Sequence, residues 1–327
     1  MKVAVTGANG FLGSHVVERL LARGDEPVAV VRPSADLKWL QGVEVEVARA
    51  TLDDRDKLPR VLDGVEAVVH LAGATRARPR SRFFDINVGL TRAVLDASLR
   101  AARPPRRVVL SSSLAAAGPS SSRQPLTESQ PALPVGAYGR SKRDAEQLLL
   151  ADRRVEGVVL RPPGIYGPRD VDVLEMLQLA RHGIFVQVGS GRLLYNWLYA
   201  LDAAEAFVCA CHAPAAAGEV FNVGDDTNYT AAEFDRIVAE AVGTPRRLTL
   251  HLPMFAVKVA ALVGELAALA SPRPPLLNWD KAKIVTAGSW ALDTSKAREL
   301  LGWEPAFTTA EGMAATVAWY RRKGWLA

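Results

Sequence analysis

The chain has 327 residues, of which 49% are hydrophobic and 23% charged, so it is long and apolar enough to bury a large core. This composition excludes disorder, collagen and coiled coil as classes. Its 40 basic residues nearly balance 35 acidic ones, the net charge is +5 and no long basic run occurs, so nucleic-acid binding is not expected.

The first half of the chain alternates short apolar runs with longer amphipathic segments. Strands are predicted over residues 2–6, 27–31, 43–47, 66–71, 106–111 and 155–160. Helices are predicted between them, for example over 12–23, which Gly24 would cap, and over 85–102, where apolar residues recur three and four apart. Nearly all-apolar strands separated by helices are typical of a parallel sheet covered on both faces. We therefore predict an α/β fold with a doubly wound parallel sheet.

The second half is less regular. The segment 161–169 is rich in Pro and Gly and predicts irregular backbone. Helices are expected over 173–183 and 231–242, and one more strand over 219–223. These observations suggest a smaller lobe that covers the carboxyl edge of the sheet, with a ligand in the crevice between the two parts.

Two domains are expected on this basis. The first is a dinucleotide-binding domain over residues 1–165, to which 199–224 return. The second is a substrate-binding lobe formed by 166–198 and 225–327.

Several features bear on location and partners. The chain opens as MKVAVTG without the pattern of a signal peptide, so a cytoplasmic protein is expected. The apolar stretch 252–270 contains Lys258 and Glu265 and is too short and too charged for a membrane span. We expect a helix covering the substrate side there, and a helix lying on a membrane surface is the alternative. Cys209 and Cys211 are two apart in a predicted helix and suit neither a disulfide nor a metal site, and no metal is predicted.

The first strand is followed directly by Thr6-Gly-Ala-Asn-Gly-Phe-Leu-Gly13 and then a helix. Glycines at 7, 10 and 13 would allow a tight turn, close approach of the backbone to a pyrophosphate and close packing of helix on strand. The helix N-terminus would offer N–H groups to phosphate oxygens. This arrangement predicts a dinucleotide site.

The second strand ends in Arg32, and no acidic residue follows until Asp36. An acid at this place binds the ribose hydroxyls of NAD, whereas an arginine accommodates the 2′-phosphate of NADP. We therefore favour NADP(H), with NAD(H) possible if Asp36 folds back to the ribose.

A group suited to proton transfer follows the fifth strand. Ser113 stands just after the strand end, and Tyr138 and Lys142 are four apart in a helical stretch, so they share a face. A nearby ammonium lowers the pKa of a phenol, and Tyr138 could then exchange a proton with a substrate oxygen while Ser113 donates to it. Lys142 could also bond the nicotinamide ribose.

These residues make the chain similar to the extended short-chain dehydrogenase/reductases, the NAD-dependent epimerase/dehydratase family. Thr6 to Gly13 resembles the family's TGxxGxxG, and Tyr138 to Lys142 its YxxxK, with the strand-end Ser113 before it. The resemblance implies a Rossmann fold, cofactor contacts by Asn9, Phe11 and Leu12 in the glycine loop, and a homodimer formed by the helices 85–102 and 136–151.

Further matches extend the resemblance along the chain. Segment 68–73, with Leu71, Ala72 and Gly73, is similar to the family's fourth-strand motif beside the adenosine, and Asn87 to its central-helix Asn, which supports the site. Segment 161–168 resembles the loop that meets the nicotinamide carboxamide, which implies cofactor contacts by Pro162, Gly164 and Ile165. Thr51 and Leu52 stand where the family contacts adenine, although an Asp is usual there.

Departures from the family pattern bear on the substrate. Leu114 and Ala115 occupy the positions of an Asp-Glu pair that serves water loss in dehydratases. Gly164 and Tyr195 replace polar residues common in sugar-nucleotide epimerases, so a hydroxysteroid-dehydrogenase or ketone-reductase branch is favoured. We expect hydride transfer between nicotinamide and a small apolar ketone or secondary alcohol bound near Ser113, Tyr138, Tyr195 and Trp197, with an epimerase as the alternative. A non-catalytic redox sensor is the third alternative.

The substrate side is expected to be apolar, with Phe185, Leu276, Leu277 and Trp279 as further candidates. Segment 76–84 carries arginines at alternate positions after the fourth strand. It is interpreted as a solvated lid, or else as a grip for an anionic substrate group.

Overall fold

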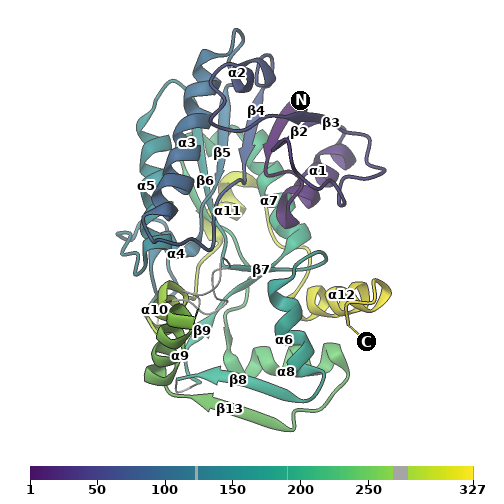
Figure 1. The fold of residues 1–327 in the computed structure, drawn as a ribbon, viewed down its shortest axis with the longest axis vertical. Coiled ribbons are helices and arrows are strands. Elements are labelled where there is room, and N and C mark those ends of the chain that lie inside the picture. The colour runs from purple at the N-terminus through teal and green to yellow at the C-terminus, as the bar shows by residue number, and fades with distance from the viewer. Residues whose placement is uncertain (122–123, 190, 268–278, 327) are drawn as a thin grey trace.

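The computed structural model describes residues 1–121, 124–189, 191–267 and 279–326. Its centre is a seven-stranded sheet in the order β11-β6-β5-β4-β1-β2-β3, and all of its pairings are parallel (Figure 1). The doubly wound α/β prediction is therefore confirmed, because this order reverses between β1 and β4. The strands are β1 (Lys2–Thr6), β2 (Glu26–Val31), β3 (Glu46–Arg49), β4 (Ala67–His70), β5 (Arg107–Ser111), β6 (Glu156–Arg161) and β11 (Val220–Asn222).

Alternation of side chains along the strands divides the core between two faces. Val3 and Val5 of β1 pack with α1 (Phe11–Arg23) and α7 (Ala200–His212). Ala4 lies on the opposite face, which is covered by α2 (Lys57–Val61), α3 (Arg82–Arg100) and α5 (Ala137–Ala151). Both faces are apolar because both are covered by helices.

Most of the remaining elements lie beyond the carboxyl ends of β5 and β6 (Figure 1). Three small pairs of strands occur there, and Tyr166, Leu177, Phe234 and Met313 belong to a separate apolar core. The strands are β7 (Gly164–Tyr166), β8 (Ile184–Val188), β9 (Leu194–Tyr195), β10 (Trp197–Tyr199), β12 (Tyr229–Thr230) and β13 (Leu248–Leu252). The helices are α6 (Asp172–Ala180), α8 (Ala231–Val242), α9 (Met254–Ala267), α10 (Trp279–Val285) and α12 (Thr309–Arg322). Two short helices, α4 (Leu114–Ala117) and α11 (Ser295–Leu301), and a 3₁₀ turn at Pro214–Ala216 complete the order.

Segment 199–224 contributes α7 and β11 to the sheet and its cover. The boundaries of the two expected domains stay a prediction. Gly24 caps α1 with φ 85°, a left-handed conformation that favours glycine, as expected.

Some elements differ from their predicted bounds. The third strand covers Glu46–Arg49 instead of 43–47, because Val43 and Val45 pack against the core without pairing. Segment 161–169 is not wholly irregular, since Gly164–Tyr166 pairs with Trp197–Tyr199. Strands β8 and β13 were not predicted. They pair with each other although about sixty residues separate them in the sequence, so no local pattern indicates the pairing.

Two further differences concern helices. Helix α3 begins at Arg82, so the end of the arginine-rich segment is helical. Helix α9 begins at Met254, because Leu252 belongs to β13 and Pro253 intervenes. Leu276 and Leu277 lie outside the described residues.

Candidate active site

The glycine loop after β1 is crowded by backbone. Gly7 has φ +71°, and a Cβ there would lie 3.1 Å from the backbone nitrogen of Ala72. A Cβ on Gly13 would lie 2.2 Å from the Gly7 carbonyl oxygen, so this position excludes a side chain. Gly10 stands at the N-cap of α1 and brings no side chain to cap the first N–H groups of Phe11, Leu12 and Gly13. The N–H groups at the start of α1 are not capped by a side chain, and the glycine turn before them leaves room for a pyrophosphate to accept hydrogen bonds from them.

The chain after β2 lies beside this loop. The Asn9 amide donates to the Asp36 carbonyl oxygen over 3.1 Å. Arg32 is exposed directly after β2, and Arg49 donates to the Pro33 carbonyl oxygen over 2.6 Å. The Asp36 carboxylate accepts the backbone N–H of Lys38 over 3.0 Å. Two guanidinium-bearing residues therefore lie at the end of the second and third strands.

The segment after β4 joins the glycine loop to the centre of the site. The Leu71 N–H donates to the Thr6 carbonyl oxygen over 3.3 Å, and the Ala72 N–H to the Thr6 hydroxyl over 3.3 Å. A Cβ on Gly73 would lie 2.9 Å from Asn87 Oδ1 and 3.3 Å from Lys142 Nζ. Gly73 is thus the point where the β4 loop, α3 and α5 meet.

Asn87 is buried and holds two elements together. Its Oδ1 accepts the Ala74 N–H over 2.9 Å, and its Nδ2 donates to the Ser141 hydroxyl over 2.9 Å. Because Ser141 precedes Lys142, Asn87 fixes the helix turn that carries the lysine.

Ser113, Tyr138 and Lys142 are brought together across β5, α4 and α5. Ser113 is the N-cap of α4, where its hydroxyl accepts the Ala115 N–H over 3.2 Å. The Tyr138 ring packs on Phe83, with ring centroids 5.8 Å apart. The Lys142 ammonium donates to the Ser111 carbonyl oxygen over 2.8 Å. The strand end and the helix face thus meet as the sequence suggested.

Burial has the largest effect on the pKa values of Tyr138 and Lys142. Burial raises the pKa of Tyr138, and a hydrogen bond with Ser113 offsets part of that rise. Burial lowers the pKa of Lys142 to about 8, and the charge of Glu146 opposes this shift. Ser113, rather than Lys142, is the group that lowers the pKa of Tyr138 here. The expected effect of the ammonium on the phenol stays a prediction.

The expected carboxamide loop faces the lobe beyond the sheet. The Pro162 carbonyl oxygen accepts the Leu114 N–H over 2.8 Å. Gly164 and Ile165 lie in β7, and a Cβ on Gly164 would lie 2.8 Å from the Trp197 ring. Trp197 stacks on Phe234 with centroids 4.4 Å apart. This glycine therefore lets the loop approach the indole closely.

A cavity of about 410 Å³ opens beside Ser113 and Tyr138. This volume suits a small ligand. Most of its wall is apolar, and two of its polar residues are already used by the protein. The Asp280 carboxylate accepts the Ala137 N–H over 2.7 Å, and the Asn196 amide donates to the Asp225 carbonyl oxygen over 2.8 Å. The lining residues are Thr75, Ser113, Leu114, Ala115, Tyr138, Pro163, Gly164, Tyr195, Asn196, Trp197, Asp280, Lys281, Ile284, Val285 and Trp290.

Two other expected substrate residues lie elsewhere. Phe185 is buried in the separate core of the lobe, and Trp279 packs with α9. Thr51 is exposed after β3, and Leu52 packs on the core face that carries α2 and α3. A contact of Thr51 and Leu52 with adenine stays a prediction.

The arginine-rich segment is tied to the lobe by ion pairs. Arg76 pairs with Asp172 of α6 over 2.5 Å. Arg80 lies 3.5 Å from Asp280 and 3.7 Å from Glu265. These two guanidinium groups are engaged by carboxylates of the chain, which argues against the anionic-substrate interpretation.

The sequence did not point to Glu146, which lies behind Ser113 and Lys142, or to several residues of the cavity wall. Glu146 stands one helical turn after Lys142, so the i, i+4 spacing could have revealed it. Ile284, Val285 and Trp290 carry no such signal, because only the packing of the lobe brings them to the cavity. In the described ranges, no helix has both the length and the apolarity to cross a membrane, and no cluster of side chains is placed to hold a metal ion.

Comparison with known proteins agrees with this geometry. The model of the NAD-dependent epimerase/dehydratase family matches residues 3–224. A ceramide reductase of Caulobacter vibrioides is 31% identical, covering 99% of this chain and 96% of its own, and a UDP-glucose 4-epimerase of Mycolicibacterium smegmatis is 28% identical, covering 99% of each. The crystal structure of gox2253 superposes with a TM-score of 0.81 at 26% identity over 99% of both chains. The chain therefore belongs to the NAD-dependent epimerase/dehydratase family and is an enzyme with the extended short-chain dehydrogenase/reductase fold.

Proposed function

We propose that this enzyme is an NAD(P)-dependent dehydrogenase/reductase that interconverts an apolar ketone and its secondary alcohol. The observation that carries the proposal is the cavity beside Ser113 and Tyr138, whose wall is mostly apolar. Such a wall desolvates an apolar substrate favourably, and the two hydroxyls at one end can fix a single oxygen.

The side chains have distinct tasks in this reaction. A nicotinamide cofactor would, when bound, supply a hydride to the substrate carbon or accept one from it. In reduction, the Ser113 hydroxyl donates a hydrogen bond to the carbonyl oxygen, where negative charge develops. The Tyr138 O–H delivers the proton to that oxygen, and the phenolate takes it back in oxidation. For Lys142, which donates to Ser111, we propose that its positive charge favours the phenolate in addition to the hydrogen bond with Ser113.

The walls of the cavity disfavour other reactions of the family. Leu114 and Ala115 line it and cannot transfer the protons that water loss requires. The Trp197 indole ring lines the cavity, whereas its N–H is buried without a partner among the described residues, so the indole offers the substrate an apolar surface. The name of the ceramide reductase among the relatives supports a ketone substrate, whereas that of the UDP-glucose 4-epimerase supports an epimerase as the second candidate.

We propose a preference for NADP(H) over NAD(H). Arg32 is exposed at the end of β2, where a guanidinium can pair with a 2′-phosphate at two points. The carboxylate of Asp36 already accepts the Lys38 N–H, which supports this preference.

We also propose a homodimer formed by α3 and α5. These helices cover the same face of the sheet and lie side by side at one edge of the molecule (Figure 1). The expectation comes from the family resemblance, and the mass from light scattering tests it. A monomer mass would overturn it.

The experiment that tests the function is an assay of a panel of ketones and alcohols with both cofactors. A dehydrogenase changes the nicotinamide absorbance in proportion to product, with the largest kcat/KM for apolar ketones. An epimerase converts its substrate without net change in absorbance. No turnover of any ketone, together with epimerisation of a sugar nucleotide, would overturn the proposal.

A further inference from the structure

We propose that the outer face of α9, together with β13, docks on a lipid bilayer that carries anionic headgroups. Along α9, large apolar side chains stand outward at intervals of four, three and four residues, which is one face of a helix. Phe255 is 70% exposed and Leu266 58% exposed. The residues of this outer face are Phe255, Val259, Leu262, Val263 and Leu266.

The opposite side of α9 is also apolar but buried. Val257 and Ala261 pack against Ala282 of α10. The helix is therefore fixed to the lobe by one side, and its outer face has no cover among the described residues. Monomeric soluble proteins seldom expose a contiguous apolar patch of this kind without a partner.

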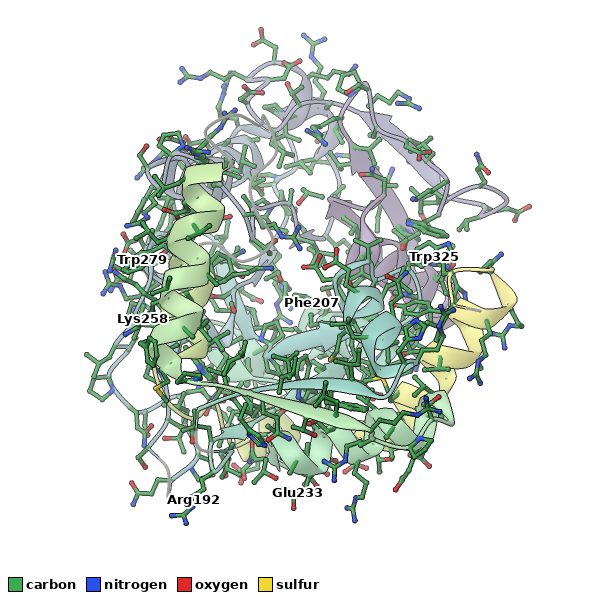
Figure 2. All side chains as sticks on the ribbon, turned by 60° about the horizontal axis from the view of Figure 1, so that its bottom comes forward. Arg192, Phe207, Glu233, Lys258, Trp279 and Trp325 are labelled. Atoms are coloured by element: carbon green, nitrogen blue, oxygen red, sulfur yellow. The ribbon has the colours of Figure 1, made fainter. Side chains whose placement is uncertain are left out.

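Strand β13 extends the patch. Leu248, Leu250 and Leu252 stand at alternate positions, point to one side of the strand and are all exposed. Figure 2 shows α9, with Lys258, and the long strands β8 and β13 on the face turned toward the viewer. The apolar surface thus continues from a helix onto a neighbouring two-stranded sheet.

The charges around this surface select the partner. Lys258 is exposed on α9, and Arg246 and Arg247 are exposed just before β13. The acidic Glu265 is engaged by Arg80 at 3.7 Å and accepts the Trp279 N–H over 3.0 Å. An apolar face with a cationic rim fits anionic headgroups. A second copy of this chain fits less well, because a twofold interface would bring like charges together.

The length of α9 sets how it would lie. Its 14 residues span about 21 Å, which is shorter than the hydrocarbon core of about 30 Å. The helix would therefore lie in the plane of the interface with its outer face immersed. On its other side, Ile284 and Val285 of α10 line the cavity, so an apolar substrate could pass from the bilayer to the site. This last step rests on the proposed function, whereas the docking does not.

Flotation of the purified full chain with lipid vesicles tests the docking. Vesicles of phosphatidylcholine and phosphatidylglycerol in equal parts are compared with vesicles of phosphatidylcholine alone. The chain should float with the mixed vesicles, and the variant F255Q/L262Q/L266Q should lose about tenfold or more in bound fraction. A matched control, L133Q/V171Q/L179Q, changes exposed apolar residues outside α9 and β13 and should float like the unchanged chain. R246Q/R247Q/K258Q should lose the preference for the anionic vesicles.

Three results would overturn the proposal. The first is no flotation at low ionic strength, and the second is equal flotation of the α9 variant. The third is a dimer mass in light scattering that the α9 variant reduces to a monomer while neither form floats, which would make this face an interface between copies. Thermal unfolding of each variant confirms that it is folded. Vesicle binding needs no turnover, so its outcome is independent of the ketone assay.

Discussion

The carboxylate of Glu146 and the guanidinium of Arg161 form a buried two-point ion pair behind Ser113 and Lys142, with distances of 2.9 Å from Nε to Oε1 and 2.6 Å from Nη2 to Oε2. The hydroxyl of Ser112 donates to the same carboxylate. Because Ser112 precedes Ser113 and Glu146 stands one turn after Lys142, the pair ties the strand end to the helix that carries Tyr138. We infer that Glu146 is a positioning residue.

Glu146→Gln tests this role. It removes the negative charge that raises the pKa of Lys142, so the basic limb of the pH–rate profile should move to lower pH. It also leaves Arg161 buried without its counter-charge, which should cost about 3–5 kcal/mol of stability. Glu156→Gln is the matched control, because Glu156 pairs with the buried Arg107 at the far end of β5 over 2.7 Å. The control should lower stability and leave the pH profile in place; equal profiles for both variants would contradict the positioning role.

Tyr138→Phe should lower kcat about 10²–10⁴-fold, because it removes the proton that the reaction exchanges. The ring keeps its packing on Phe83, so thermal stability should hold, and quenching or enhancement of nicotinamide fluorescence should show that the cofactor still binds. Ser113→Ala should act in the same direction by removing the donor to the substrate oxygen. A rate unchanged by Tyr138→Phe would remove this phenol from the mechanism.

Arg32→Glu should reverse the preference between the two cofactors. It replaces a partner of the 2′-phosphate by a group that repels it and can accept ribose hydroxyls, so kcat/KM should fall at least about tenfold with NADP(H) and rise with NAD(H). Arg23→Glu makes the same change of charge at the end of α1 and serves as the control. If the ratio of kcat/KM with NADP(H) to kcat/KM with NAD(H) is the same for both variants, Arg32 does not determine the cofactor preference.

Trp197→Phe keeps an aromatic ring for the stack on Phe234 and shortens the indole that lines the cavity. KM for an apolar ketone should rise several-fold while kcat changes little, since the smaller ring makes less apolar contact with the bound substrate. Trp197→Ala also removes the stack and should raise KM for every substrate. Identical KM values for Trp197→Phe and the unchanged enzyme would show that the outer part of the indole makes no substrate contact.

His70 should make the fold sensitive to acid. Burial lowers its pKa to about 3, and its Nδ1 lies 2.8 Å from the Thr6 hydroxyl. Between pH 6.5 and 3 the unfolded chain binds a proton that the folded chain does not, so stability should fall with decreasing pH, by up to about 1.4 kcal/mol per pH unit from this group. His70→Asn should unfold with a shallower pH dependence than the unchanged chain in this window. Parallel stability curves in urea would show that His70 does not contribute.

The sequence alone determined the doubly wound sheet, because short apolar strands alternating with amphipathic helices are local patterns. It also identified five candidate site residues, because each stands at a fixed position relative to a strand end or a helix turn. These residues are Gly7, Gly13, Ser113, Tyr138 and Lys142. The spacing of Tyr138 and Lys142 needs only the helix period.

Only the tertiary structure decided what surrounds these residues. The pairing of β8 with β13, the contact of Glu146 with Arg161 and the closure of the cavity by Ile284 and Trp290 join segments that are far apart or carry no periodic signal. The pKa of Tyr138 depends on burial, and burial is a property of the packed chain. The sequence does not show which apolar face of α9 is exposed, because the residues on both of its sides are hydrophobic. Only the folded structure shows that one side packs on α10 while the other is exposed.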